Sequence, residues 1–116
     1  EGIYDETEAA RIPEDLLTRF IEPKGAGMVP VPTLRDLITY AELNLVGPWP
    51  MERPFDIIFC RNVVIYFDKA TQGELWPRFA DALLPGGMLF IGHSERLNGA
   101  GEARFEPAGI TQYRRI

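Results

Sequence analysis

The most continuous apolar stretch of the chain lies in its second half. Phe55–Cys60 is apolar at almost every position, which predicts a parallel-sheet strand covered on both faces by helices. Asp68 is a good helix N-cap, and apolar residues then recur on one helical stripe at Leu75, Phe79, Ala82 and Leu83. Residues 85–87, Pro-Gly-Gly, end this helix and lead into an apolar strand at 88–92. The pattern predicts a right-handed βαβ unit.

Shorter elements are predicted before this unit. A short amphipathic helix from Glu14 to Pro23 is indicated by the helical spacing of Leu16, Leu17, Phe20 and Ile21. Residues 28–32 alternate with prolines, which favours an edge strand because each proline removes a backbone donor. Residues 38–45 alternate as a further strand. Together these segments predict a small β-rich unit.

At the end of the chain, residues 104–107 and 111–116 are expected to form a closing hairpin around a turn at Ala108 and Gly109. Composition fits a globular protein, with 46% hydrophobic and 25% charged residues. The formal charge is −5 and no basic cluster is visible, so a nucleic-acid partner is not expected. No apolar run approaches the roughly 18 residues of a membrane span. The single cysteine, Cys60, fits a cytoplasmic protein without disulfides.

Polar residues follow both predicted buried strands. Arg61 and Asn62 come directly after the first strand, and residues 93–95, His-Ser-Glu, come after the second. In open α/β sheets ligands bind beyond the carboxyl ends of the strands, so these residues are candidates for a binding crevice. The alternative is that the chain simply reaches water there. An apolar loop with one amide and one phenol, residues 62–67, favours a site.

These motifs resemble the CheR family of chemotaxis-receptor glutamate O-methyltransferases. The likeness is carried by FCRNVVIYF at 59–67, LPGG at 84–87 and GHSE at 92–95, with weaker likeness at 13–17 and 42–45. The resemblance implies a partial class I S-adenosylmethionine (SAM) methyltransferase fold, which is a Rossmann-like α/β sheet with an inserted small antiparallel β-subdomain. It implies a cytoplasmic enzyme that transfers a methyl group from SAM to glutamate carboxylates of methyl-accepting chemotaxis receptors, leaving S-adenosylhomocysteine.

The same resemblance implies a set of site residues. Asn44 and Leu45 would meet the adenine end of SAM, and Arg61 and Asn62, with Val63 beside them, would lie nearest its methionine part and methyl donor. A glutamate carboxylate has an ordinary pKa of about 4.3 and is ionised at neutral pH, so methyl transfer needs positioning and no general base.

Arg61 could hold one oxygen of that carboxylate by a charge-assisted hydrogen bond, and Tyr66 could donate to the other, which would make both residues catalytic. The alternatives are that Arg61 only pairs with Asp56 or Glu95, and that Tyr66 is a core aromatic.

Two further residues are interpreted as structural. Cys60 is expected to be a small buried hydrophobe, since no second group is spaced to activate it. His93 is the only histidine, so no metal site is predicted; it is expected to border the cofactor crevice.

In some members of the family the β-subdomain docks a receptor's C-terminal peptide by strand addition. Here Pro30 and Pro32 remove two backbone donors. Direct recognition of the receptor's helical methylation region therefore stands as the alternative. The expected organisation is a helical lead-in over residues 1–24, a β-subdomain over 25–45 that runs into a sheet strand, and the C-terminal half of the methyltransferase domain over 46–116.

A class I SAM methyltransferase also needs a glycine-rich turn after its first strand and an acidic residue after its second. The chain has neither, so we expect its first two sheet strands to be missing and the isolated chain to be inactive. A second hypothesis is a non-catalytic receptor- or peptide-binding module derived from the same fold. The presence of Asn44, Arg61, Asn62 and Tyr66 favours the enzyme. Exposed sheet edges also allow a swapped or edge-paired dimer.

Overall fold

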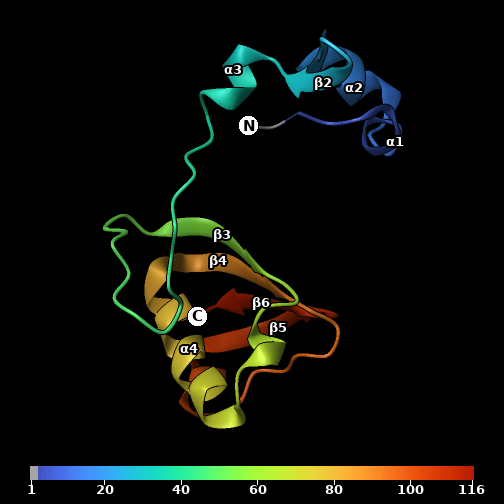
Figure 1. The fold of residues 1–116 in the computed structure, drawn as a ribbon. Coiled ribbons are helices and arrows are strands. Elements are labelled where there is room, and N and C mark those ends of the chain that lie inside the picture. Colours follow the sequence, from blue (N-terminus) through green and yellow to red (C-terminus); the bar gives the residue numbers. More distant parts are fainter. Residues whose placement is uncertain (1–2) are drawn as a thin grey trace. The chain divides into compact units, whose positions relative to one another are not determined.

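The computed structural model of the protein describes residues 3–116. The chain divides between Glu42 and Leu43 into two compact units, and Figure 1 shows the elements of each. This division lies near the boundary predicted after residue 45; the predicted domain limits themselves stay predictions. No helix among the described residues is both long and apolar enough to cross a membrane.

The first unit is built from short elements around one hairpin. In chain order they are α1 (Glu6–Ala9), α2 (Glu14–Phe20), β1 (Ile21–Lys24), β2 (Gly27–Pro30) and α3 (Pro32–Arg35). Strands β1 and β2 pair antiparallel, and the turn between them uses Gly25 at a φ of 61°, a conformation that glycine adopts without strain. The helix predicted to reach Pro23 therefore ends at Phe20, because the next residues pair with β2.

Residues 38–45 are the clearest difference from the sequence-based expectation. The structure has no strand there: residues 38–44 belong to no regular element, and Leu45 begins a turn. A strand needs a neighbour for its backbone N–H and C=O groups, and within residues 3–116 no strand pairs with this segment. The side chains of residues 38–44 are consequently exposed, with Tyr40 83% exposed, whereas Leu45 packs against the core of the second unit. The alternating pattern alone was insufficient to predict a strand.

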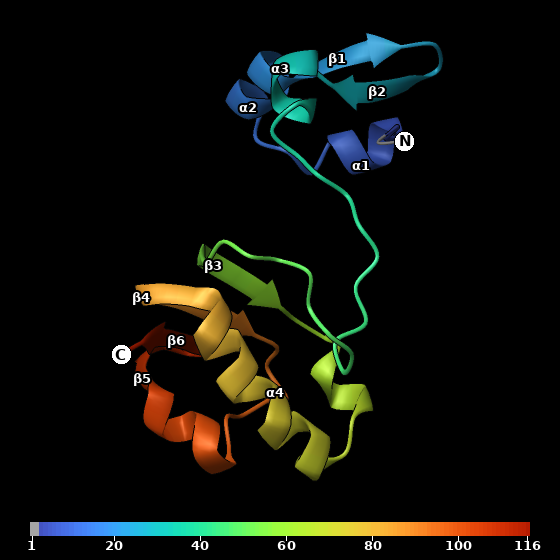
Figure 2. The ribbon, with the colours of Figure 1, turned by 90° about the vertical axis from the view of Figure 1, so that its left-hand side faces the viewer.

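The second unit is a four-stranded mixed sheet with one long helix. Its elements are β3 (Phe55–Cys60), the 3-10 helix η1 (Val64–Tyr66), α4 (Lys69–Ala82), β4 (Leu83–Ile91), η2 (Gly99–Arg104), β5 (Phe105–Gly109) and β6 (Gln112–Arg115). The sheet order is β3-β4-β6-β5. Strands β3 and β4 are parallel and are joined through α4, as Figure 2 shows. The predicted βαβ unit is confirmed.

The core of this unit lies between α4 and the sheet. Leu75, Trp76 and Phe79 of α4 are buried with Leu89 and Ile91 of β4. Each fully buried apolar side chain of this size stabilises the fold by about 1.5–3 kcal/mol. The N-cap prediction is confirmed as well, since the Asp68 carboxylate accepts a hydrogen bond from the backbone N–H of Thr71 at 2.7 Å. The helix thus begins where the sequence indicated and packs through its predicted stripe.

Strand β3 is covered on one face only, which corrects the expectation of helices on both. Phe55, Ile57 and Phe59 are 39%, 51% and 69% exposed, although Phe59 stacks on Phe90 with ring centroids 4.7 Å apart. Helix α4 covers the opposite face, where Cys60 is buried. In the described part of the chain no second helix packs on the outer face, so an apolar strand is left half exposed.

The two turns predicted next to the sheet lie at different residues from those expected. The helix ends at Ala82, and residues 84–87 bulge out of β4, because Phe55 pairs with Leu83 while Ile57 pairs with Met88. The closing hairpin is confirmed, but its turn lies at residues 110–111, since Gly109 still pairs with Gln112.

Gly101 marks a close approach between η2 and α4. A Cβ added at Gly101 would lie 2.2 Å from the Cβ of Trp76, and the Trp76 indole also donates to the Asn98 Oδ1 at 3.0 Å. We predict that Gly101→Ala lowers the free energy of unfolding by roughly 1–3 kcal/mol, the usual cost of overpacking. The urea midpoint should fall with an unchanged m-value.

Gly99→Asn is the matched control. Gly99 has a φ of 63° with open space around it, and asparagine tolerates this conformation. If the Gly101→Ala and Gly99→Asn proteins unfold at the same urea concentration, η2 does not pack on Trp76 as described.

Candidate functional site

The loops that follow β3 and β4 meet at the carboxyl ends of the two strands. Cys60 and Ile91 are register partners at the end of the parallel ladder, so Asn62 and Gly92 leave the sheet side by side. A Cβ added at Gly92 would lie 3.1 Å from the Asn62 Oδ1 and 3.2 Å from its backbone nitrogen. The structure therefore brings together the two sets of polar residues that the sequence placed after these strands.

Asn62 turns the chain at this point. Its φ is 60°, the left-handed conformation, which asparagine adopts more readily than most residues. Arg61 and Val63 on either side are exposed, whereas Val64 is fully buried in the core. The buried Val64 anchors the loop just after the turn. The turn therefore holds Arg61 and Asn62 at the surface.

The rest of the loop is held by Gln72, which the sequence analysis did not identify. The Gln72 Nε2 donates to the carbonyl oxygens of Val64 and Phe67, both at 3.0 Å. Tyr66 lies between these two residues and is 82% exposed. The sequence does contain a signal for Gln72: it is a polar residue three positions before Leu75, on the stripe of the helix that is predicted to be buried.

Glu95 closes the loop after β4. It is 2% exposed, and its Oε2 accepts the Gly92 N–H at 2.8 Å. Its Oε1 is buried without a hydrogen-bond partner among the described residues. Burial first, and the negative charge of Glu95 second, raise the pKa of the Cys60 thiol to about 11. Cys60 is therefore a neutral buried group at physiological pH, which agrees with its interpretation as a small hydrophobe.

The structural alternatives for Arg61 and Tyr66 find no support. The ion pairs of residues 3–116 join Arg104 to Asp81 and Arg114 to Glu106, so Arg61 pairs with neither Asp56 nor Glu95. The exposure of Tyr66 likewise excludes it from the core. Both side chains are available to a ligand at the surface.

The Asn44–Leu45 segment forms a separate turn of the same unit. Asn44 Oδ1 accepts from the Val46 N–H at 3.2 Å, and the Asn44 carbonyl accepts from the Gly47 N–H at 3.0 Å. No hydrogen bond of the described residues joins this turn to Arg61 or Asn62. Leu45 and Cys60 nevertheless line one largely apolar hollow of about 290 Å³. An apolar hollow suits a flat aromatic group of a ligand, and an exposed guanidinium such as that of Arg61 suits a carboxylate.

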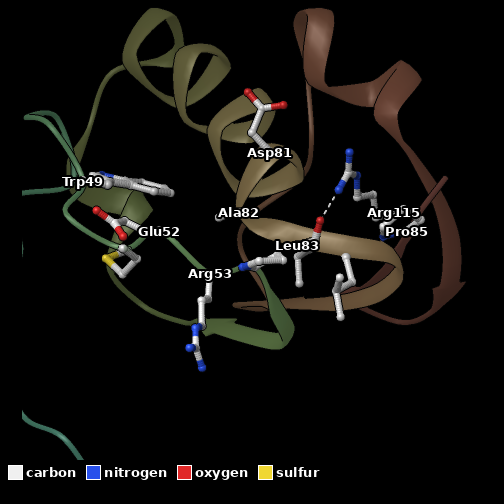
Figure 3. Close-up of a pocket in the computed structure, with 11 residues that line it drawn as sticks. Trp49, Glu52, Arg53, Asp81, Ala82, Leu83, Pro85 and Arg115 are labelled. Carbon is white, nitrogen blue, oxygen red and sulfur yellow. Dashed lines mark hydrogen bonds between the residues drawn. The ribbon is translucent and has the colours of Figure 1, made fainter.

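A different pocket, of about 230 Å³, lies at the opposite end of the strands. Figure 3 shows Arg53 and Pro85 in its lining, with Arg115 donating to the Leu83 carbonyl. These residues surround the starts of β3 and β4. Because ligands of open α/β sheets bind beyond the carboxyl ends, this pocket is not the candidate site. No group of three or more metal-ligating side chains occurs among residues 3–116.

Comparison with known proteins decides the family. The family model "CheR methyltransferase, SAM binding domain" matches residues 1–114. The chain belongs to the CheR methyltransferase family. This confirms the resemblance inferred from the FCRNVVIYF, LPGG and GHSE motifs, and the mixed α/β sheet is consistent with that domain.

The CheR relatives are longer than this chain. It is 45% identical over 117 residues to a probable chemotaxis protein methyltransferase of Rhizobium etli, covering 97% of this chain and 44% of that protein. It is 42% identical over 117 residues to the chemotaxis protein methyltransferase of Escherichia coli, covering 97% and 41%. The chemotaxis protein methyltransferase Cher2 of Pseudomonas putida is 40% identical over 100 residues, covering 84% and 36%. The chain spans less than half the length of these relatives.

The single cysteine gives a direct test of the site's interior. Because the pKa of Cys60 is about 11 and the thiolate is the reactive form, we predict that a thiol reagent labels the folded chain at pH 8 at least tenfold more slowly than the urea-unfolded chain. Glu95→Gln should increase the rate in the folded state only modestly, since burial is the larger cause. Equal labelling rates in the folded and unfolded chains would contradict the burial of Cys60.

Proposed function

We propose that this chain is part of a SAM-dependent protein-glutamate O-methyltransferase that acts on chemotaxis receptors. Its family and the names of its relatives support the reaction class. The observation that carries the proposal is the exposed, unpaired guanidinium of Arg61 beside the left-handed turn at Asn62, at the carboxyl end of β3. A cytoplasmic location follows from a receptor substrate of this kind.

The cofactor would be held at two places. Asn44 and Leu45 would meet its adenine end, and Arg61, Asn62 and Val63 its methionine part. When bound, SAM supplies an electrophilic methyl group. Support comes from the apolar hollow at Leu45, which matches the adenine end in polarity, and from the exposure of Arg61 and Asn62 at the carboxyl end of β3.

Arg61 and Tyr66 would orient the substrate glutamate. Its carboxylate is ionised at neutral pH and acts as the nucleophile without a base. Arg61 would hold one oxygen by a charge-assisted hydrogen bond, and the Tyr66 hydroxyl would donate to the other. The buried Val64 and the two hydrogen bonds from Gln72 keep both residues on one fixed loop. Such fixed placement is what a positioning mechanism requires.

The chain alone is proposed to bind SAM weakly and to be inactive. Neither a glycine-rich strand-to-helix turn nor an acidic strand end for the ribose is among its 116 residues. The edge-paired or swapped dimer also stays a prediction, and the free edge of β3 supports it.

The hairpin favours direct receptor recognition over peptide docking by strand addition. On β2, the N–H and C=O of Met28 are bonded to Tyr4 at 2.8 and 2.7 Å. Pro23 pairs with Met28, so Ile21 and Pro23 face the outer edge of β1. The Ile21 N–H is bonded to the Leu17 carbonyl, and proline has none. The β1 edge therefore offers no free N–H to an added strand. This also weighs against the non-catalytic peptide-binding module.

The catalytic roles are tested by Arg61→Ala and Tyr66→Phe in the native full-length protein. Both side chains are exposed, so the free energy of unfolding should change by less than about 0.5 kcal/mol. We predict that each substitution lowers the methylation rate constant by at least tenfold, because each removes a carboxylate-orienting group. The measurement is transfer of labelled methyl from SAM to a receptor fragment.

Arg114→Ala serves as the control, since it removes the same charge from a half-exposed residue paired only with Glu106. Near-normal turnover in the Arg61 or Tyr66 variant would exclude the role assigned to that residue.

Receptor docking is tested by calorimetry with a peptide from the C-terminus of a receptor. We predict a dissociation constant weaker than ~1 mM, because the hairpin edges lack free donors, while a fragment with the helical methylation region is still methylated. Micromolar peptide binding by the wild-type protein would contradict the proposal, whether the Pro23→Ala variant loses that binding or keeps it.

A further inference from the structure

Arg78 of α4 makes an unusual set of contacts with a distant segment. Its Nη1 donates to the Leu45 carbonyl at 2.6 Å, its Nη2 donates to the Gly47 carbonyl, and its guanidinium lies 4.3 Å from the ring centre of Trp49. The side chain is half-buried and is in no ion pair of the described residues. All its charge is thus directed at two backbone carbonyls and one aromatic face.

Trp49 holds the same turn from a second side. Its indole N–H also donates to the Leu45 carbonyl, at 3.0 Å. The Trp49 ring packs on Phe79 with centroids 5.3 Å apart, which ties it to the core beneath α4. The carbonyl of Leu45 therefore accepts two hydrogen bonds. The bond from the charged guanidinium is the stronger of the two.

We infer that Arg78 is a positioning residue for the adenine end of SAM. It acts through the backbone of Leu45 and Gly47, and so fixes the turn that carries Asn44. The inference rests on the proposed function, which places Asn44 and Leu45 at the cofactor. Without Arg78, the turn keeps its internal hydrogen bonds to Asn44 and the contact of Trp49 with Phe79, but loses its hydrogen bonds to α4.

The contacts call for arginine and not merely for a positive charge. A guanidinium presents a planar fork that can donate to two carbonyls while stacking on an aromatic ring. A lysine ammonium is a point charge on a flexible stem and cannot reproduce both contacts at once. Arg78→Lys therefore keeps the charge and removes the positioning.

The experiment compares wild type, Arg78→Lys and Arg114→Lys in the native full-length protein. We expect Arg78→Lys to raise the KM for SAM about tenfold, equivalent to ~1.4 kcal/mol, with kcat changed less than twofold. Calorimetry should show the same loss for SAM and for 5′-methylthioadenosine, which carries the adenine end without the amino-acid part. Asn62→Ala should weaken SAM binding and leave methylthioadenosine binding unchanged. Arg114→Lys should match wild type.

Unchanged KM and dissociation constants in Arg78→Lys would overturn the inference. So would a joint fall of kcat and thermal stability with KM unchanged, since that is the result of a purely structural role. If Arg78→Lys does not fold, Trp49→Phe keeps the ring and removes one donor to Leu45; we expect it to weaken both ligands about threefold, and no change would overturn the inference. A wild-type protein that does not bind SAM would instead overturn the proposed function.

Discussion

The packing of α4 on β4 is the contact on which the second unit depends. Leu75, Trp76 and Phe79 fill the space above the central strands, and this places the polar side chains of the same helix over two loops. Gln72 reaches the loop that contains Tyr66, and Arg78 reaches the turn at Leu45. One amphipathic helix therefore both buries the core and fixes segments that lie far apart in sequence.

The carboxyl ends of β3 and β4 show how backbone geometry makes the site. Gly92 has no side chain, so the backbone and the side-chain amide of Asn62 can lie in contact with the Gly92 backbone. Asn62 itself adopts a left-handed conformation. Glu95 then closes the second loop through the Gly92 N–H. A larger residue at 92 would separate the loops, so their close approach depends on a glycine 30 positions from Asn62.

Elements with local signals could be predicted from sequence, and elements that depend on distant partners could not. The Asp68 cap and the stripe through Leu75 and Phe79 are local, and both predictions are confirmed. The strand predicted at 38–45 is absent because a strand also needs a neighbour. Arg78 and Gln72 were missed because their partners are backbone carbonyls, which leave no mark in a sequence pattern. The family resemblance supplied the cofactor and site residues, whose roles stay predictions.

Topology, and not the size of a hollow, locates the candidate site. The pocket of about 230 Å³ lies at the amino end of the β3–β4 pair, and the hollow of about 290 Å³ runs along β3 from Phe55 to Cys60. At the amino end the chain enters β4 directly from α4, without a loop between them. At the carboxyl end both strands release loops with exposed polar groups. Ligands of open α/β sheets bind at that end of the strands.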